Sequence, residues 1–421
     1  MSFPRYPKYK PSGVEWLGEV PEHWAVKRLK HNARLLTEKT DRRDHPVGLE
    51  NIEGWSGRFI PTETAFEGEG IAFDAGDILF GKLRPYLAKA YLAQSSGEAV
   101  GDFHVMRPAV GIEARFAQYQ ILNREFIAIV DGSTFGSKMP RASWEFVGGM
   151  KVTLPPLPEQ TAIAEFLDRE TAKIDGLVAE QRRLMELLKE KRQAVISHAV
   201  TKGLNPHAPM KPSGIEWLGD VPAHWELKAT KRLFRLVTDQ APDDNDHELL
   251  SIYTAIGVRP RKELEAKGNK ATTTDGYWLV KKGDLIVNKL LAWMGAIGVS
   301  EYDGVTSPAY DILRRRVPLD PRFYDYLFRC GICFSEFRRW SRGIMDMRLR
   351  LYFEDFGRLV MPYPSESEQR EIVGYLHVEL ERFDTLTAEA QRAIDLLQER
   401  RTALISAAVT GQIDVRPPTK N

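Results

Sequence analysis

The chain contains two copies of one arrangement, and this internal duplication constrains its fold more than any other feature. Residues 9–24 read YKPSGVEWLGEVPEHW and residues 210–225 read MKPSGIEWLGDVPAHW, so twelve of sixteen positions are identical at an offset of 201. GDILFGKL at 76–83 corresponds to GDLIVNKL at 283–290, and 158–201 corresponds without a gap to 367–410. Self-similarity of this kind indicates two structural units built alike.

The repeats divide the 421 residues into alternating preserved and variable segments, and this length by itself predicts two or more domains. The two variable regions share little beyond GD-x-x-x-x-KL, which predicts a common architecture with two different targets. The predicted segments are a tag (1–25), a variable domain (26–153), a long helix (154–203), the repeated tag (204–225), a second variable domain (226–360), a second long helix (361–412) and a tail (413–421).

Apolar residues recur every seven positions in both long segments, as in a coiled-coil stripe that must be buried against a partner helix. Each segment has about 40 residues, hence a length of roughly 60 Å if fully helical. The simplest partner for each helix is the other copy, although two amphipathic helices packed on their own domains remain an alternative. The predicted pairing residues are Leu167, Ile174, Leu177, Leu184, Leu188, Leu376, Phe383, Leu386, Leu397 and Leu404.

Signals at the ends of these segments support the helix assignment. Pro158 suits a first helical position, and Ser365 with Glu368 has the spacing of a capping box. Gly203 and Gly411 follow the repeated AVT and are plausible helix stops.

The variable regions are predicted to be mixed α/β. Short alternating runs suggest strands on both sides of a turn near Arg84-Pro85, and again around residues 292–295. The predicted fold class is therefore α+β, with two α/β domains and two long antiparallel coiled-coil helices.

Two loops combine hydroxyls, glycines and cations, the groups that contact phosphate oxygens and base edges in nucleic acids. They are DGSTFGSKMPRASWEF at 131–146 and SRGIMDMRLRLYFEDF at 341–356; between residues 329 and 350, six arginines oppose two acids, a net charge of +4. A surface turn or a solvated charged face is the alternative. The candidate contacts are Lys82, Arg84, Ser133, Ser137, Lys138 and Arg141 in the first domain, and Lys289, Trp293, Arg342, Arg348 and Arg350 in the second.

Composition and missing motifs narrow the functional classes. The overall charge of +1 gives no general basic signature, and we find no membrane-spanning run or secretory signal. Two cysteines, Cys330 and Cys333, fit a reducing cytoplasm and ordinary packing. We find no phosphate-binding loop, no dinucleotide or methyl-donor motif and no metal-ligand spacing, so no catalytic or metal site is predicted.

With these residues in view, the chain resembles the specificity subunits of type I restriction–modification systems, the HsdS family, over essentially its whole length. The resemblance rests on PSGVEWLGEVPEHW and its copy, GDILFGKLRP, and LPPLPEQTAIAEFLD before the first long helix. SESEQREIVGYL is a looser second version that lacks the double proline.

This resemblance implies two target-recognition domains in a pseudo-two-fold arrangement, each reading one half of a split, asymmetric DNA site. The two long helices would set the spacing of the half-sites and dock two methyltransferase subunits, which restriction subunits would join. S-adenosylmethionine, ATP and Mg would then belong to those partners, and the chain itself would not be an enzyme. A coiled-coil scaffold that binds no DNA and a self-contained DNA-modifying enzyme are the alternatives.

Overall fold

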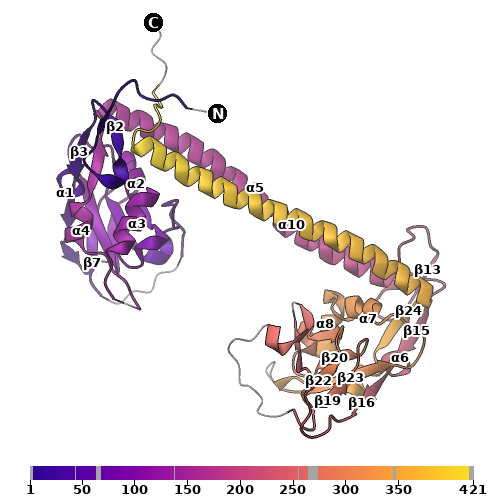
Figure 1. The fold of residues 1–421 in the computed structure, drawn as a ribbon. Helices are drawn as coiled ribbons and strands as arrows, with labels where there is room; N and C mark the ends of the chain where they lie inside the picture. The colour runs from indigo at the N-terminus through magenta and orange to yellow at the C-terminus, as the bar shows by residue number, and fades with distance from the viewer. Residues whose placement is uncertain are drawn as a thin grey trace. The chain divides into compact units, whose positions relative to one another are not determined.

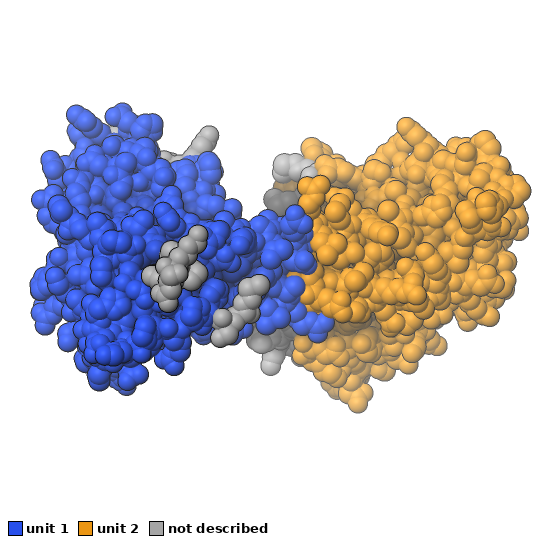
Figure 2. Space-filling view, turned by 90° about the horizontal axis from the view of Figure 1, so that it is seen from above, with its two compact units in different colours: residues 1–182, 391–421 blue, residues 183–390 orange. Residues whose placement is uncertain are grey.

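The computed structural model describes residues 3–42, 44–62, 68–136, 138–254, 256–263, 274–344 and 348–416. The chain forms two compact units, residues 1–182 with 391–421 (unit 1) and residues 183–390 (unit 2), which Figure 2 colours separately. Each unit combines one tag, one variable domain, the first part of one long helix and the last part of the other.

Both variable domains mix short strands with short helices (Figure 1). Unit 1 contains β1 (Tyr9–Pro11), η1 (Glu15–Leu17), β2 (Glu19–Pro21), β3 (Ala25–Arg28), α1 (Leu29–Asn32), β4 (Ala33–Leu36), β5 (Lys39–Thr40), β6 (Pro46–Val47), η2 (Leu49–Asn51), β7 (Gly70–Phe73), β8 (Ile78–Gly81), η3 (Pro85–Leu87), β9 (Ala90–Leu92), β10 (Gly97–Ala99), β11 (Phe103–Pro108), α2 (Ala114–Ile121), α3 (Arg124–Gly132), α4 (Trp144–Gly149) and β12 (Lys151–Leu154).

Unit 2 contains β13 (Met210–Pro212), β14 (Asp220–Pro222), β15 (Glu226–Ala229), α6 (Thr230–Leu233), β16 (Phe234–Val237), β17 (Leu250–Tyr253), β18 (Gly257–Pro260), η4 (Arg261–Glu263), β19 (Trp278–Val280), β20 (Leu285–Asn288), η5 (Ala292–Met294), β21 (Ile297–Val299), β22 (Gly304–Thr306), β23 (Tyr310–Arg315), α7 (Pro321–Phe328), α8 (Gly331–Trp340), α9 (Phe353–Phe356) and β24 (Val360–Tyr363).

Each of the two domains contains an antiparallel four-stranded sheet of the same topology. Its order is β4-β11-β8-β9 in unit 1 and β16-β23-β20-β21 in unit 2. Strands β8 and β20 carry the repeated GD-x-x-x-x-KL motif and are buried along their whole length, because helices and neighbouring strands cover them. The predicted strands on both sides of the turns at Arg84-Pro85 and at 292–295 are confirmed, and so is the mixed fold class.

The Gly-Asp pair of this motif shapes the turn before the strand. Gly76 has a φ of +90°, a conformation that favours glycine. Asp77 is 1% exposed; it accepts a hydrogen bond from the Asp74 amide (2.8 Å) and binds the Arg107 guanidinium through both oxygens (2.8 and 2.7 Å). The second copy repeats this arrangement with Gly283, Lys281, Asp284 and Arg314. The motif is therefore an internal anchor, which explains why both copies keep it.

The long helices are α5 (Leu157–Lys202) and α10 (Glu366–Val409). With 46 residues, α5 is about 69 Å long. Both helices end just before the predicted glycines, Gly203 and Gly411, which have φ angles of +74° and +76°. Ser365 caps α10 through a bond from the Glu368 amide (3.3 Å), which is one half of the predicted capping box, while the Glu368 carboxylate binds His224 and Trp225 of the tag.

The Glu-Gln pair at the start of each long helix binds the tag and the domain. In unit 1, Glu159 accepts hydrogen bonds from the Trp24 indole (2.9 Å) and pairs with His23 (2.7 Å). In unit 2, Glu368 binds Trp225 (2.9 Å) and His224 (3.0 Å) in the same way. Both tryptophans are fully buried, so the repeated His-Trp of the tags is structural, as the sequence indicates.

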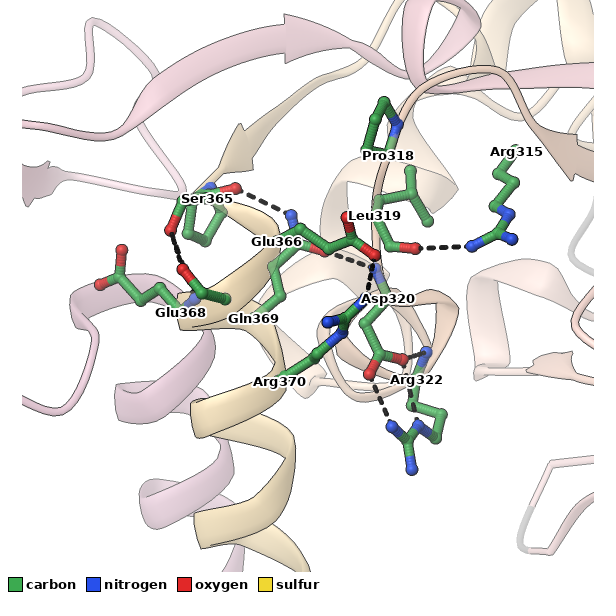
Figure 3. A network of polar contacts seen from close by, with 12 residues as sticks. Arg315, Pro318, Leu319, Asp320, Arg322, Ser365, Glu366, Glu368, Gln369 and Arg370 are labelled. Carbon is green, nitrogen blue, oxygen red and sulfur yellow. Dashed lines mark hydrogen bonds and ion pairs between the residues drawn. The ribbon is translucent and has the colours of Figure 1, made fainter.

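The neighbouring glutamine fixes the domain to the helix start. Gln369 accepts a hydrogen bond from the Asp320 amide (2.9 Å; Figure 3). It also donates one to the Pro364 carbonyl (2.8 Å). In unit 1, Gln160 makes the equivalent bonds with the Glu113 amide (2.9 Å) and the Pro155 carbonyl (2.9 Å).

The two long helices pack against each other in antiparallel fashion within each unit (Figure 1). One predicted heptad series lies in this seam: Leu167, Ile174, Leu188, Leu376 and Phe383 are buried, and Leu397 and Leu404 are partly buried. The structure corrects the second series, because Leu177, Leu184 and Leu386 are 52%, 42% and 46% exposed. The companion series instead follows four residues after the first one, at Thr171, Val178, Leu380, Ile394, Arg401 and Ala408, all buried.

The correction has a simple physical cause. A heptad stripe has neighbours at both +3 and +4 on the helix surface, and either pair of rows can form the seam. In the +3 row the basic residues Lys191 and Arg400 are exposed, and the glutamates Glu170 and Glu379, 23% exposed, pair with Lys173 and Arg382 of their own helices.

Two further observations concern the rest of the described chain. Cys330 and Cys333 are buried free thiols at the start of α8. Among the described residues, no helix combines the length and the apolar character that a membrane crossing requires.

Candidate nucleic-acid interface

In unit 1 a short hairpin follows α3 and pairs with the turn after β8. Phe135 and Arg141 exchange backbone hydrogen bonds (3.3 and 3.1 Å) at its base. The Arg84 amide donates to the Pro140 carbonyl (2.8 Å), and the Ala142 amide donates to the Lys82 carbonyl (2.9 Å). Two loops about 55 residues apart in sequence thereby form one surface, and they are the two loops that supplied the sequence candidates.

The cations of this surface fall into two groups. Arg141 binds both oxygens of Asp102 (3.0 and 2.8 Å), and the Lys82 ammonium lies 3.7 Å from the same carboxylate. The hydrogen bond from Arg141 lowers the pKa of Asp102, so the carboxylate stays ionised and offsets one of the two charges. Arg84 and Lys138 are exposed.

Exposed apolar side chains lie among these cations. Phe135 is 63% exposed, Met139 49% and Tyr86 47%. Arg84 itself has a φ of +51°, a strained conformation for a residue with a side chain. Of the remaining candidates, the Ser133 hydroxyl donates to the Val130 carbonyl at the end of α3 (2.7 Å), and Ser137 lies outside the described residues.

Unit 2 presents a corresponding hairpin. Arg342 and Arg350 exchange backbone hydrogen bonds (2.8 and 2.9 Å), and the Leu351 amide donates to the Lys289 carbonyl (2.9 Å), as Ala142 does to Lys82 in unit 1. Ile344 is 98% exposed and Arg348 is exposed, on either side of residues 345–347, which are not described. Each domain thus has a hairpin that is hydrogen-bonded to the segment after β8 or β20, and the two hairpins carry different side chains.

The candidate residues of unit 2 also differ in their intramolecular contacts and in their exposure. The Arg342 guanidinium pairs with Asp355 (2.6 Å) and lies 5.9 Å from the Tyr352 ring, yet 62% of the Arg342 side chain is exposed. Arg350 donates to the Leu349 carbonyl (3.0 Å) and is partly buried.

Lys289 and Trp293 are held more firmly. The Lys289 side chain is 20% exposed, and its ammonium contacts Asp311 (3.3 Å) and the Pro308 carbonyl (3.1 Å). Burial raises the pKa of Asp311, while Lys289 opposes that shift. The Trp293 indole donates to the Leu290 carbonyl (3.0 Å), and Arg338 lies over its ring at 5.2 Å. Lys289 and Trp293 therefore stabilise the loop after β20, and Arg338 lies next to the candidate interface.

Sequence reasoning missed the exposed apolar residues of both surfaces. The prediction was based on hydroxyls and cations in the loops, whereas Phe135, Tyr86 and Ile344 are residue types that are usually buried. Their position in Gly- and Pro-rich turns was the available signal, because such turns lie on the surface.

No protein-family model matches the chain. It is 22% identical over 426 residues to the type I restriction enzyme EcoDI specificity subunit of Escherichia coli, an alignment that covers 96% of this chain and 92% of that protein. It is 27% identical over 236 residues to the MjaVIII specificity subunit of Methanocaldococcus jannaschii, which covers 51% of this chain and 50% of that one.

Solved structures show the same fold. The HsdS subunit of Thermoanaerobacter tengcongensis matches with a TM-score of 0.54 and 16% identity, covering 93% of this chain and 98% of that chain. A chain from a structure on complex assembly and conformational transition of the type I R-M system matches with a TM-score of 0.66 and 18% identity, covering 93% and 98%. Fold and sequence therefore agree with the resemblance seen in the repeated motifs.

Proposed function

We propose that this chain, which belongs to the HsdS family of specificity subunits, is the non-catalytic DNA-reading subunit of a type I restriction–modification complex. It would read a bipartite, asymmetric site, with one half-site for each recognition domain. The observation that carries this proposal is the pair of corresponding hairpins, which share their backbone attachment but differ in their exposed side chains.

Each hairpin surface has the groups that DNA recognition needs. Phosphate contacts position a protein on the duplex, whereas side chains that reach base edges select the sequence. Arg84 and Lys138 in unit 1 and Arg348 in unit 2 are exposed cations suited to either role. Because the two scaffolds carry different residues at their tips, the two half-sites would differ, and the complete site would be asymmetric.

The exposed leucines of the long helices support a docking role. Leu177, Leu184 and Leu187 on α5 are 42–52% exposed, and Leu386 and Leu396 on α10 are 46% and 66% exposed. Apolar side chains gathered on an exposed helix often mark a protein interface. We propose that two methyltransferase subunits bind the long helices and that restriction subunits join them. S-adenosylmethionine, ATP and Mg would bind to those partners, in the cytoplasm.

A domain exchange tests the bipartite model. Residues 226–358 are replaced by the corresponding region of another specificity subunit, and the methylated sites are mapped in cells that carry the complete system. The model predicts that one half-site changes while the other half-site and the spacer stay the same. A change in both halves would contradict it.

Two outcomes would favour other functions. A chain that shifts no duplex in a gel, with or without its methyltransferase partners, would be a scaffold. Methyl transfer by the purified chain alone would make it an enzyme in its own right.

A further inference from the structure

Two arginines occupy equivalent positions in the paired helices. Arg401 of α10 and Arg192 of α5 correspond at the offset of 209, and so do their partners, Asp384 and Asp175. Arg401 binds Asp175 (Nε–Oδ1 2.9 Å), and Arg192 binds Asp384 (Nη1–Oδ1 2.6 Å). Each unit therefore contains an ion pair that links the two long helices.

Arg401 has an additional partner in the recognition domain. Its Nη1 donates a hydrogen bond of 2.8 Å to the carbonyl oxygen of Trp55. The Arg401 side chain is 10% exposed, so water competes little for these bonds. One guanidinium thus joins α5, α10 and the loop 53–58 of domain 1, as we call the variable domain of unit 1 (26–153); domain 2 is the variable domain of unit 2 (226–360).

The loop that Arg401 holds has a defined shape. Trp55 has a φ of +65°, and its amide donates to the Ala88 carbonyl (2.9 Å) at the end of η3. A Cβ atom on Gly54 would lie 2.3 Å from the Leu87 carbonyl oxygen, so the loop is seated tightly on η3. Because η3 directly follows Arg84, the loop is connected to the candidate interface by a short, packed path.

A second tether in unit 1 acts on the same domain. The Tyr119 hydroxyl and the Arg115 guanidinium both bind Asp168 of α5, the former at 2.9 Å. His377 stands at the corresponding position of α10, and it pairs instead with Glu381 of its own helix.

Arg192 makes no hydrogen bond to the described residues of domain 2. Its hydrogen bonds go to Asp384 and to the Leu380 carbonyl (3.4 Å), both on α10. The Thr254 carbonyl accepts a bond from Arg329 of its own domain, and Arg192 and Thr254 line a cavity of ≈ 950 Å³. In unit 1 the cavity beside Trp55 and Arg401 is smaller, ≈ 580 Å³.

We propose that Arg401 is a positioning residue that clamps recognition domain 1 to the helix pair through the Trp55 carbonyl, and that Arg192 does not clamp domain 2 in this way. Given the function proposed above, domain 1 presents its reading surface in a fixed direction, and domain 2 is the more adjustable reader. Arg401 then contributes to the choice of spacer length without touching DNA.

The clamp is tested in the purified full chain by hydrogen–deuterium exchange. Arg401→Met keeps an apolar seam position filled but removes the bond to Trp55. The amides of residues 51–58 should exchange about tenfold faster, the effect of losing one hydrogen bond to a charged group. The matched variant Arg192→Met should leave the exchange of domain 2 unchanged.

A second control separates the clamp from the ion pair. Asp175→Asn weakens the link between the helices but leaves the Arg401–Trp55 bond, so residues 51–58 should stay protected. Unchanged exchange of this loop in Arg401→Met would overturn the proposal. Equal acceleration of the two domains in the two Arg→Met variants would also overturn it.

The consequence for spacing is tested in the complex with methyltransferase subunits. Duplexes carry both half-sites at the natural separation or one base pair closer or further apart. We expect Arg401→Met to reduce the preference for the natural separation at least fivefold, and Arg192→Met to retain it. If residues 51–58 exchange faster in Arg401→Met but the preference for the natural separation is unchanged, the role of Arg401 in spacing is refuted. A wild-type complex that methylates none of these duplexes would refute the proposed function, and the exchange experiment would still decide on the clamp.

Discussion

Acid should loosen domain 1 through a single histidine. His104 in β11 is 7% exposed, its Nε2 lies 3.0 Å from the Ala142 carbonyl oxygen, and its ring centre is 5.7 Å from that of Trp144. Burial lowers the pKa of His104 from 6.5 to about 4; the nearby Lys82 lowers this pKa further, and the bond to Ala142 opposes the shift. Because Ala142 also joins the hairpin to the turn after β8, protonation of His104 would place a charge where the candidate interface is held together.

The direction of the pH effect on stability follows from the protonation of His104 in the folded and the unfolded chain. Above pH 6.5 the ring is neutral in the folded and the unfolded chain, and its full contribution to stability is present. Between pH 6.5 and 4 the unfolded chain binds a proton that the folded chain excludes, so the free energy of unfolding decreases as the pH is lowered. The shift from 6.5 to about 4 corresponds to about 3 kcal/mol, lost by about pH 4.

His104→Gln tests this reasoning, because glutamine can still donate to the Ala142 carbonyl but does not titrate. The imidazole pKa is measured by NMR in the full chain, with the variant supplying the assignment. Thermal unfolding at several pH values between 7 and 4.5 then shows whether domain 1 of the variant loses less stability than the wild type. His377→Gln is the control, since the His377 side chain is 70% exposed. A His104 resonance that titrates near pH 6.5 would refute the argument, as would an unchanged pH dependence in the variant.

Two further predictions concern the anchors and the helix surface. Glu368→Gln weakens the acceptor of the Trp225 indole and should lower the stability of unit 2 by about 1–2 kcal/mol, measured by thermal unfolding, with Glu159→Gln acting likewise on unit 1. Leu184→Glu should abolish co-purification with methyltransferase subunits at an unchanged melting temperature, because this side chain is 42% exposed; loss of folding instead would show that Leu184 packs within the chain.

The sequence was sufficient to predict the repeated architecture, because its signals are local. Helix stops at Gly203 and Gly411 depend on backbone conformations that glycine adopts readily, and short alternating runs mark strands. The seam was predicted only in part. Leu177 and Val178 are adjacent and both apolar, and heptad spacing alone does not decide which of them faces the partner helix; burial shows that Val178 does.

The candidate interface was predictable only at the level of loops. The sequence indicates that Lys82 and Arg141 lie in polar turns, but their shared contact with Asp102 depends on folding that brings the turn and the hairpin together. Nor does residue type distinguish an exposed phenylalanine from a buried one: Phe135 is 63% exposed, whereas Phe126, nine residues earlier, is fully buried.

The division between preserved and divergent residues has a structural explanation that bears on specificity. The motifs that both copies keep are contacts at junctions: Asp77 holds a turn within the domain, Glu159 holds the tag, and Gln160 holds the domain to the helix start. Under the proposed function, each of these contacts is needed whichever bases the domain reads. The side chains of the two hairpins are not tied to such junctions: Phe135 is 63% exposed and Ile344 is 98% exposed. Under the proposed function, the motifs that carry the resemblance therefore hold no information about the recognised bases, and a change of specificity can leave every one of them intact.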